Sequence, residues 1–316
     1  MMYRLMAGMC ALIVAASAHA GKYPSRSVTL IVPYAAGSAT DIMARGLASE
    51  MQRVLGQTVV VLIREGASGV IGMNALTQSP PDGLTLAYTP LTPVTVQPHL
   101  IAGTGLGPDA VAPVCGVTEN ILAIAVKADS PLHGIDELIQ KARSGAQASY
   151  GSPGPNSGPA LGVEDLARSQ HVPFTHVAFR GDIPSLQELM AGRLDFAAIV
   201  AASASAFVKA GRVRLLAVMS DRRHPEFPTV PTLTELHYPV TQLSYTAIFA
   251  PKDTPKDILD TLEHACAETV ASDAIQRLAA GSNQVMKYQP RSRMDKSVRE
   301  QYQMQGRSLH PGNGDK

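Results

Sequence analysis

The 316-residue chain has no tryptophan, few other aromatic residues and almost no net charge, with 27 basic residues against 26 acidic ones. It therefore lacks the basic surface that attracts nucleic acid or an anionic membrane, and we expect neither as a partner. Its histidines are scattered, with no pair at metal-ligand spacing, so no metal site and no cofactor are expected. Of the three cysteines, Cys115 and Cys266 lie in the body of the chain. They either form a disulfide or remain two buried thiols.

An uninterrupted apolar run extends from Met6 to Ala16, after a single charge at Arg4 and before the small-residue ending Ala18-His19-Ala20. This pattern predicts a secretory signal peptide over residues 1–20. The run is shorter than the roughly 20 residues that span a bilayer, and no later segment supplies such a run. We expect a mature protein that starts near Gly21, is exported to the periplasm and is not membrane-embedded. An uncleaved anchor is the alternative.

From Ser27 onward, short β-branched runs alternate with breaks rich in Gly, Ser and Pro and with segments of helical apolar spacing. This alternation predicts an α/β fold of mainly parallel sheets flanked by helices. The first unit is a strand at Val28 to Val32 and a helix at Thr40 to Leu55, closed by Gly56. Further strands are expected at Val59–Ile63, Leu84–Tyr88, Ile121–Val126, Tyr245–Phe249 and near Ala148, Thr175, Asp195 and Val213, and further helices at Ile71–Leu76, Ile135–Arg143, Leu161–Ser169 and Ile183–Met190.

The apolar runs at Ile121–Val126 and Tyr245–Phe249 are expected to carry the chain between two lobes. The predicted boundaries place residues 21–121 and 246–284 in lobe 1, and residues 122–245 and 285–316 in lobe 2. Such an arrangement leaves a cleft between the lobes, where ligands commonly bind.

Three loops rich in glycine, serine and alanine follow strands and lead into helices: Pro33 to Asp41, Glu65 to Gly69, and Gly151 to Gly158. In the first, Ser38 and Asp41 have the spacing of a capping box. Loops at the carboxyl ends of parallel strands are favoured ligand sites, and helix N-termini attract anions. The three loops therefore predict a ring of backbone donors around a small anion. The simpler interpretation is that any strand-to-helix turn needs small residues and a cap.

Charged residues near these loops have two interpretations each. Arg64 and Arg180 border glycine loops, where a guanidinium can grip a carboxylate through two parallel bonds, or they are solvated. Asp195 follows the turn Gly192-Arg193 and is either a turn residue or an acceptor for a ligand amine or hydroxyl.

No enzymatic motif is complete, so no catalytic residue is assigned. None of the three loops has the lysine of a phosphate-binding P-loop, and none fits Gly-x-Ser-x-Gly. A serine hydrolase that uses Ser152 with a distant base such as His176 stays open, because triads are assembled in space rather than in sequence.

The chain resembles the Bug family, the TctC-like solute-binding receptors of tripartite tricarboxylate transporters. The matching strings run in order along nearly the whole mature chain: Tyr23-Pro24, Ile31-Val32-Pro33-Tyr34-Ala35-Ala36-Gly37 with Asp41 and Ala44-Arg45, Leu55-Gly56-Gln57, Gly66-Ala67 with Gly69 and Ile71-Gly72, Pro81-Asp82-Gly83, Tyr150-Gly151-Ser152-Pro153-Gly154, Phe179-Arg180-Gly181, Gly192-Arg193-Leu194-Asp195, Leu216-Ala217-Val218, Pro228-Thr229-Val230-Pro231-Thr232, and Ala250-Pro251.

The resemblance implies a two-lobed periplasmic-binding-protein (flytrap) fold that closes on a small organic acid. Main-chain amides and waters would hold the acid, and membrane permease subunits would receive it from a monomeric receptor. The implied contacts are Tyr34, Ala36, Gly37, Ser38, Ala39, Thr40, Asp41, Gly66, Ala67, Ser68, Gly69, Thr89, Pro90, Ser152, Pro153, Gly154, Asn156 and Ser157, to which the loop analysis adds Arg180 and Asp195.

Three positions depart from the family pattern. Ser38 stands where the family usually has a second glycine, Glu65 brings a negative charge beside the expected anion site, and Ala160 replaces a common polar residue. These departures leave the ligand open among a smaller, less charged or aromatic acid and a neutral solute. A sensory receptor that passes its signal to a partner protein is the other function that this fold would serve.

Overall fold

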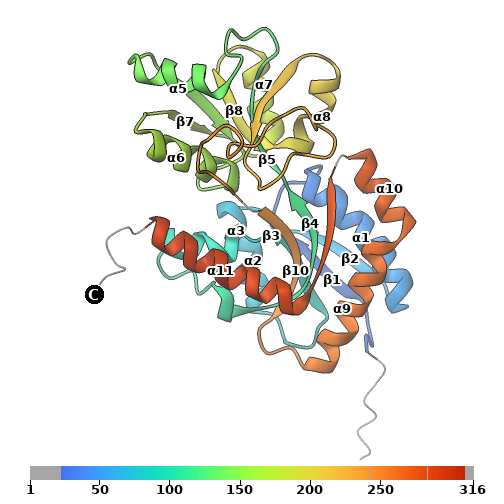
Figure 1. Cartoon of the computed structure of the whole chain (residues 1–316). Coiled ribbons are helices and arrows are strands. Elements are labelled where there is room, and N and C mark those ends of the chain that lie inside the picture. Colours follow the sequence, from blue (N-terminus) through green and yellow to red (C-terminus); the bar gives the residue numbers. More distant parts are fainter. Residues whose placement is uncertain (1–22, 243, 283, 310–316) are drawn as a thin grey trace, which may run out of the picture.

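The computed structural model describes residues 23–242, 244–282 and 284–309 (Figure 1). The expected signal peptide, residues 1–20, lies outside the described residues. Within those ranges, none of the helices combines the length and the apolar character that a membrane crossing requires.

Lobe 1 is built on a six-stranded sheet in the order β11-β4-β10-β3-β1-β2. One face packs on α1, α9 and α10 through Met43, Leu47, Leu262 and Ile275, and the other on α2 and α11 through Met73 and Met294. The elements are β1 (Val28–Val32), α1 (Ala39–Leu55), β2 (Val59–Ile63), α2 (Val70–Thr77), β3 (Thr85–Pro90), α3 (Thr92–Thr95), α4 (Gln97–Leu100), β4 (Val111–Asn120), β10 (Ser244–Pro251), α9 (Lys256–Ala271), α10 (Asp273–Gly281), β11 (Val285–Pro290) and α11 (Arg291–Leu309), with one-turn helices at Ala67–Gly69 and Pro108–Ala110.

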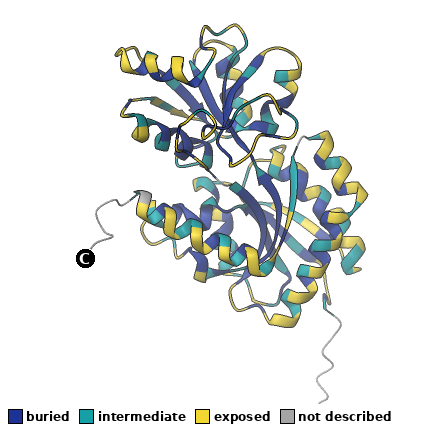
Figure 2. Ribbon diagram, in the orientation of Figure 1, coloured by how far each residue is buried: buried dark blue, intermediate teal, exposed yellow. Residues whose placement is uncertain are grey.

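Lobe 2 is built on a five-stranded sheet in the order β7-β6-β8-β5-β9. Leu138 and Leu166 fill the core on one face, and Leu186 and Ala204 fill it on the other. The elements are β5 (Leu122–Lys127), α5 (Ile135–Arg143), β6 (Ser149–Ser152), α6 (Gly158–Gln170), β7 (Thr175–Ala178), α7 (Asp182–Met190), β8 (Phe196–Val200), α8 (Ala201–Lys209) and β9 (Val213–Val218). In both lobes the buried strands lie between helices whose outer faces are exposed (Figure 2).

Both sheets are mixed, whereas the sequence predicted mainly parallel ones. Strands β1, β2 and β3 are parallel, as are β6, β7 and β8, but β10 is antiparallel to β3, and β5 is antiparallel to β8. The reason is that β5 and β10 bring the chain into a lobe. They start at the edge where the parallel strands end, and so they must run the other way.

The chain leaves lobe 1 at Asn120, the last residue of β4, and enters lobe 2 at Leu122, the first residue of β5. Beside this crossing, the Glu119 carboxylate is almost fully buried and pairs with Arg222, which follows β9, and with Lys287 on β11 at 3.1 Å. The Lys287 ammonium also lies 5.4 Å from the ring centre of Tyr245, on the strand that returns the chain. One carboxylate therefore ties cations from both lobes to the crossing.

The C-terminal segment belongs to lobe 1, which corrects the expectation that residues 285–316 join lobe 2. Strand β11 pairs antiparallel with β4, and α11 packs against the same sheet through Met294 and Val298. The sequence missed this because β11 is short and half-exposed, with an irregular register between Met286 and Gln289. Residues 310–316 lie outside the described part of the chain.

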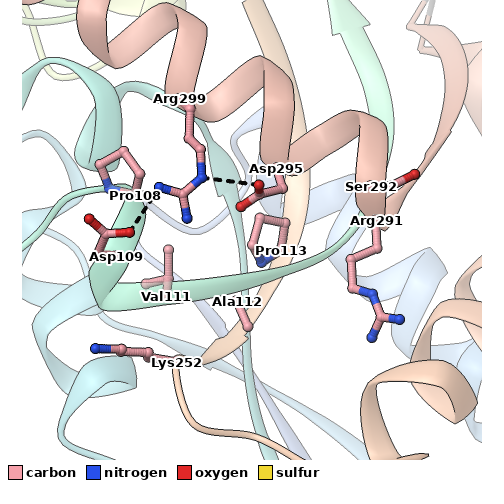
Figure 3. A pocket seen from close by; sticks show the side chains of 10 residues that line it. All are labelled: Pro108, Asp109, Val111, Ala112, Pro113, Lys252, Arg291, Ser292, Asp295 and Arg299. Atoms are coloured by element: carbon pink, nitrogen blue, oxygen red, sulfur yellow. Dashed lines mark hydrogen bonds and ion pairs between the residues drawn. The ribbon is translucent and has the colours of Figure 1, made fainter. Parts of the chain in front are cut away.

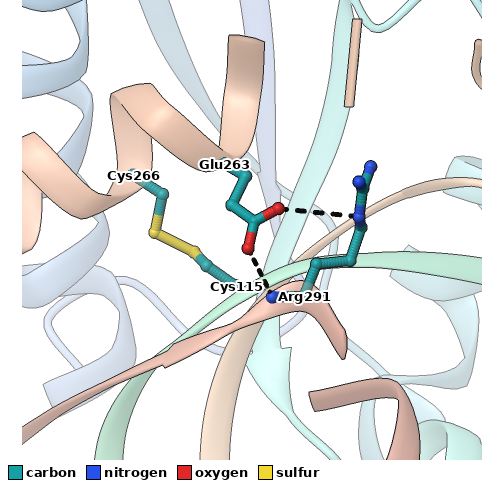
Figure 4. Close-up of a disulfide and its surroundings, with 4 residues drawn as sticks. All are labelled: Cys115, Glu263, Cys266 and Arg291. Atoms are coloured by element: carbon teal, nitrogen blue, oxygen red, sulfur yellow. Dashed lines mark hydrogen bonds and ion pairs between the residues drawn. A yellow bond between two sulfur atoms is a disulfide. The ribbon is translucent and has the colours of Figure 1, made fainter. Parts of the chain in front are cut away.

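Cys115 on β4 and Cys266 on α9 form a disulfide, which decides between the two interpretations left open by the sequence (Figure 4). Both residues are fully buried, and the bond links positions 151 residues apart. One helical turn before Cys266, the Glu263 carboxylate accepts a 2.7 Å hydrogen bond from the Arg291 amide at the start of α11. Helix α9 is thus fastened to the sheet covalently and to α11 by a hydrogen bond.

Replacing both cysteines in the mature chain, Cys115→Ala with Cys266→Ala, is expected to lower the free energy of unfolding by about 2–4 kcal/mol. Without the bond the unfolded chain regains the freedom of a long loop. Urea unfolding of the variant and of the unreduced protein measures the difference. A thiol titration of the denatured, unreduced mature protein that finds both thiols free would contradict the pairing.

Candidate ligand-binding site

The loops predicted from the sequence meet where the two lobes face each other. In lobe 1 they follow the ends of β1, β2 and β3, and in lobe 2 they follow the ends of β6, β7 and β8. We call these two facing sheet edges the interlobe edges. The loops touch directly, because the Ser68 hydroxyl donates a 3.3 Å hydrogen bond to the Pro155 carbonyl of the other lobe.

The first loop, Tyr34 to Thr40, opens α1 with a serine cap. The Ser38 hydroxyl accepts a hydrogen bond from the Asp41 amide at 3.2 Å. The buried Asp41 carboxylate accepts one from the Gly37 amide at 2.8 Å and pairs with Arg45 at 2.9 Å. Gly37, Ser38 and Asp41 therefore shape the loop rather than offer their own polar groups to a ligand.

Three amides of this loop remain available. Those of Ala36, Ala39 and Thr40 have no acceptor among the described residues, and Ala36 and Ala39 are exposed. The Ala39 and Thr40 amides are the first two of a 17-residue helix, so they lie at the positive end of its dipole. This combination favours a carboxylate.

The second loop is a left-handed turn. Four consecutive residues have positive φ: Gly66 (129°), Ala67 (46°), Ser68 (53°) and Gly69 (94°). For Ala67 and Ser68 this conformation is strained, at roughly 1–2 kcal/mol each. Within the described chain, the amides of Gly66, Ala67 and Ser68 have no acceptor. Strain of this kind concentrates at functional sites, and successive backbone amides without acceptors are suited to anion binding.

Thr89, at the end of β3, adds a fully buried hydroxyl between these loops. The Tyr34 hydroxyl lies beside it as its hydrogen-bonding neighbour, and burial raises the pKa of that phenol to about 12, so Tyr34 remains neutral. Lobe 1 thus offers amides and hydroxyls, with the Asp41 charge already neutralised by Arg45.

The third loop, Ser152 to Ser157, supplies few donors, contrary to the ring of donors predicted from the sequence. Pro153, Pro155 and Pro159 have no N–H. The amides of Gly154 and Ser157 are bonded inside the loop, at 3.3 and 3.4 Å. Its tip at Asn156 has a φ of 55°.

Ser152 and His176 do come together, with their Oγ and Nε2 atoms 2.7 Å apart. The buried Ser152 hydroxyl also donates to the Gly154 carbonyl at 2.8 Å. A hydroxyl has one proton, and when Ser152 gives it to the Gly154 carbonyl, His176 Nε2 is the donor to Ser152. A general base would have to accept that proton, and the polarity is therefore opposite to that of a serine nucleophile. The pair holds the loop in shape.

The structure places the two charged candidates, Arg180 and Asp195, at opposite ends of the lobe 2 sheet. Arg180 follows β7 at the interlobe edge and is exposed. Asp195 precedes β8 and lies at the other end of the sheet, where it pairs with Lys141 and accepts the Ser149 amide at 2.8 Å. Burial tends to raise its pKa, but the hydrogen bonds from Lys141 and Ser149 hold the pKa of Asp195 below its usual value. Asp195 is therefore structural.

The sequence missed Asp182, the first residue of α7. Its carboxylate accepts a 2.6 Å hydrogen bond from the Ser203 hydroxyl and a 3.4 Å bond from the Val200 amide, where β8 passes into α8. Burial raises the pKa of Asp182 to about 6 despite these bonds. The only sequence signal was an acidic residue after Gly181. The start of α8 was not predicted from the sequence, because its small side chains resemble a continuation of β8.

A hollow of about 380 Å³ lies elsewhere, where β4 begins and β10 ends (Figure 3). Arg299 is paired there with Asp109 at 2.8 Å and with Asp295 at 3.0 Å. The hollow shares no residue with the loops at the interlobe edges.

The left-handed turn can be tested by relieving its strain. Ala67→Gly is expected to raise the free energy of unfolding by about 1 kcal/mol, because glycine adopts positive φ without a steric penalty. Ala75→Gly inside α2 is the control and is expected to lower it by about 0.5–1 kcal/mol. Urea unfolding without ligand measures both. Equal losses in the two variants would contradict strain at Ala67.

The raised pKa of Asp182 predicts that the stability of the protein depends on pH. Its folded-state pKa is raised, so the folded form holds the proton more tightly, and the stabilisation present at low pH is lost as pH rises through about 6. Asp182→Asn should therefore gain several degrees of melting temperature over the wild type at about pH 8, and less at about pH 5. Asp195→Asn, whose carboxyl has a lowered pKa, should instead lose stability by a similar amount at both pH values, because this stabilisation disappears only below about pH 4. Melting curves at both pH values test the opposite signs.

Comparison with known proteins gives a consistent assignment. Residues 43–310 match the family model described as "Tripartite tricarboxylate transporter family receptor", TctC. A UPF0065 protein from the gbd 5' region of Cupriavidus necator is 35% identical over 254 residues, which cover 79% of this chain and 76% of the relative. Protein BugT of Bordetella pertussis is 32% identical over 278 residues, which cover 83% of this chain and 82% of BugT.

Solved structures show the same fold. A TctC solute-binding protein from Polaromonas, without ligand, has 27% identity and a TM-score of 0.75, with 92% of this chain and 99% of that one covered. MatC from Rhodopseudomonas palustris with bound malate has 25% identity and a TM-score of 0.82, with coverages of 91% and 100%. An R. palustris protein with adipate has 25% identity and a TM-score of 0.83, with coverages of 92% and 98%. The chain belongs to the TctC family of tripartite tricarboxylate transporter receptors and has the two-lobed fold of its solute-binding proteins.

Proposed function

We propose that this protein is a periplasmic receptor that captures a small carboxylate between its lobes and delivers it to the permease subunits of a tripartite tricarboxylate transporter. The observation that carries the proposal is the set of unpaired amides at the lobe 1 edge, from Ala36, Ala39 and Thr40 beside the turn Gly66–Ser68. Backbone donors at a helix N-terminus are a recurring carboxylate site. Malate and adipate, bound by two structural relatives, are carboxylates of this kind.

Capture proceeds by closure of the lobes. A ligand shifts a protein toward the closed form only if it contacts both lobes there. The hydrogen bond from Ser68 to Pro155 supports a form in which the loops of both lobes already meet. Glu119, with its cations from both lobes, lies at the crossing about which the lobes would move.

The expected leader over residues 1–20 would direct the chain to the periplasm, where the disulfide Cys115–Cys266 can form. The receptor works as a monomer and performs no chemistry. The hydrogen-bond polarity of Ser152 and His176 argues against the hydrolase alternative, because the serine proton is given to a carbonyl.

Removing one amide without changing the helix tests the proposal. Ala39→Pro deletes a donor at the first helical position, where proline is well tolerated, and Ser38, with φ −67° and ψ 160°, has the extended backbone that a following proline requires. We expect an affinity loss of roughly 10- to 100-fold, typical of a hydrogen bond to a charged group. The melting temperature without ligand should be unchanged.

The measurement is titration calorimetry with whichever mono-, di- or tricarboxylate first raises the melting temperature of the mature protein. Asp273→Pro is the matched control, since it places proline behind another serine cap, Ser272, on a helix that contributes nothing to the interlobe loops. If no carboxylate of the panel binds, or if Ala39→Pro binds as tightly as Asp273→Pro, the proposed site is wrong.

A further inference from the structure

The two interlobe edges offer a ligand different hydrogen-bonding groups: donors on lobe 1 and an acceptor on lobe 2. Lobe 1 presents donors: the amides of Ala36, Ala39 and Thr40, and the left-handed turn Gly66–Ser68. The one buried carboxylate of that loop, Asp41, is already bonded to Gly37 and Arg45. A ligand carboxylate therefore fits the lobe 1 side.

The corresponding loop of lobe 2, Ser152 to Ser157, offers few free backbone N–H donors. Prolines at 153, 155 and 159 remove three N–H groups, and the amides of Gly154, Ser157 and Ala160 are bonded within the loop. In this part of the described chain only the amides of Asn156 and Gly158 are left. A loop of this composition is a poor seat for a second anion.

The start of α8, another helix N-terminus on this edge, is occupied by a carboxylate of the protein itself. The Asp182 carboxylate binds the Val200 amide and the Ser203 hydroxyl there, and it forms no ion pair with any described residue. A carboxylate has about four acceptor sites and two are used, so Asp182 retains acceptor capacity. The residue is of intermediate exposure and stands at the start of α7, directly after the loop that leaves β7 at the interlobe edge.

We propose that the ligand binds in one orientation, with its carboxylate against lobe 1 and a hydrogen-bond donor, a hydroxyl or ammonium group, against Asp182 in lobe 2. The proposal rests on the proposed function and narrows it to monocarboxylic acids that carry a donor at the far end. A second carboxylate at that end would meet the charge of Asp182, and like charges at a binding surface are strongly unfavourable. Arg180, exposed at the end of β7, is the group that would receive such a carboxylate instead.

The test compares acids of equal length that differ only at the far end. Titration calorimetry at neutral pH would pair succinate with γ-hydroxybutyrate, glutarate with δ-hydroxyvalerate, and adipate with ε-hydroxycaproate. We expect the hydroxy acid of the best-fitting pair to bind at least roughly tenfold tighter than its dicarboxylate, as for one charge-assisted hydrogen bond. This comparison needs only the wild-type protein.

Two variants separate a local effect from a general charge effect. Asp182→Asn should reduce the preference to near parity, because the amide also offers a donor to a carboxylate. Glu65→Gln removes a negative charge beside the lobe 1 loop, so it should shift both members of a pair alike and leave their ratio as in the wild type.

The outcomes distinguish a failure of the proposed orientation from a failure of the proposed function. If dicarboxylates bind more tightly than their hydroxy partners, and Arg180→Met abolishes that advantage, the receptor function stands and the orientation proposed for Asp182 is wrong. If no acid of either kind binds, the proposed function falls and the orientation falls with it. An unchanged ratio in a folded Asp182→Asn variant also overturns the orientation.

Discussion

The passage of the chain between lobes is the constraint on which the rest of the structure depends. Only Ile121 separates the end of β4 from the start of β5, so the strand that enters lobe 2 must begin at the edge facing lobe 1. The strands of the repeating strand–helix units end at that same edge, which makes the sheets mixed. It also makes the strand-end loops of one lobe face those of the other. The crossing is therefore what brings the separate loops of the two lobes together.

At the same crossing lies the Glu119 carboxylate, whose two cationic partners come from different lobes. A buried carboxylate is costly unless it is paired, and Glu119 is paired with Arg222 from lobe 2 and with Lys287 from lobe 1. Any rotation of the lobes must keep or replace these pairs. The crossing thus has a preferred geometry that is set by electrostatics and not only by the strands that form it.

The sequence predicted the fold well wherever local chemistry decides the outcome. Helix α1 was expected from its apolar spacing and its caps, and both the Ser38 cap and the left-handed Gly56 are present. Gly66 and Gly69 marked the second loop, but the left-handed conformation of Ala67 and Ser68 between them was not foreseeable, because these residues rarely adopt it. Asp182 and β11 escaped because tertiary packing places them: Ser203 is 21 residues from Asp182, and β11 pairs with a strand about 170 residues earlier.

The disulfide gives the molecule a dependence on its surroundings that its non-covalent core lacks. The link from β4 to α9 closes a loop of 151 residues that contains the whole of lobe 2. Such a bond persists only in an oxidising compartment. In reducing surroundings the chain would carry both sulfurs as thiols and would be less stable. The fold therefore reaches its full stability only where the surroundings keep the bond between β4 and α9 oxidised.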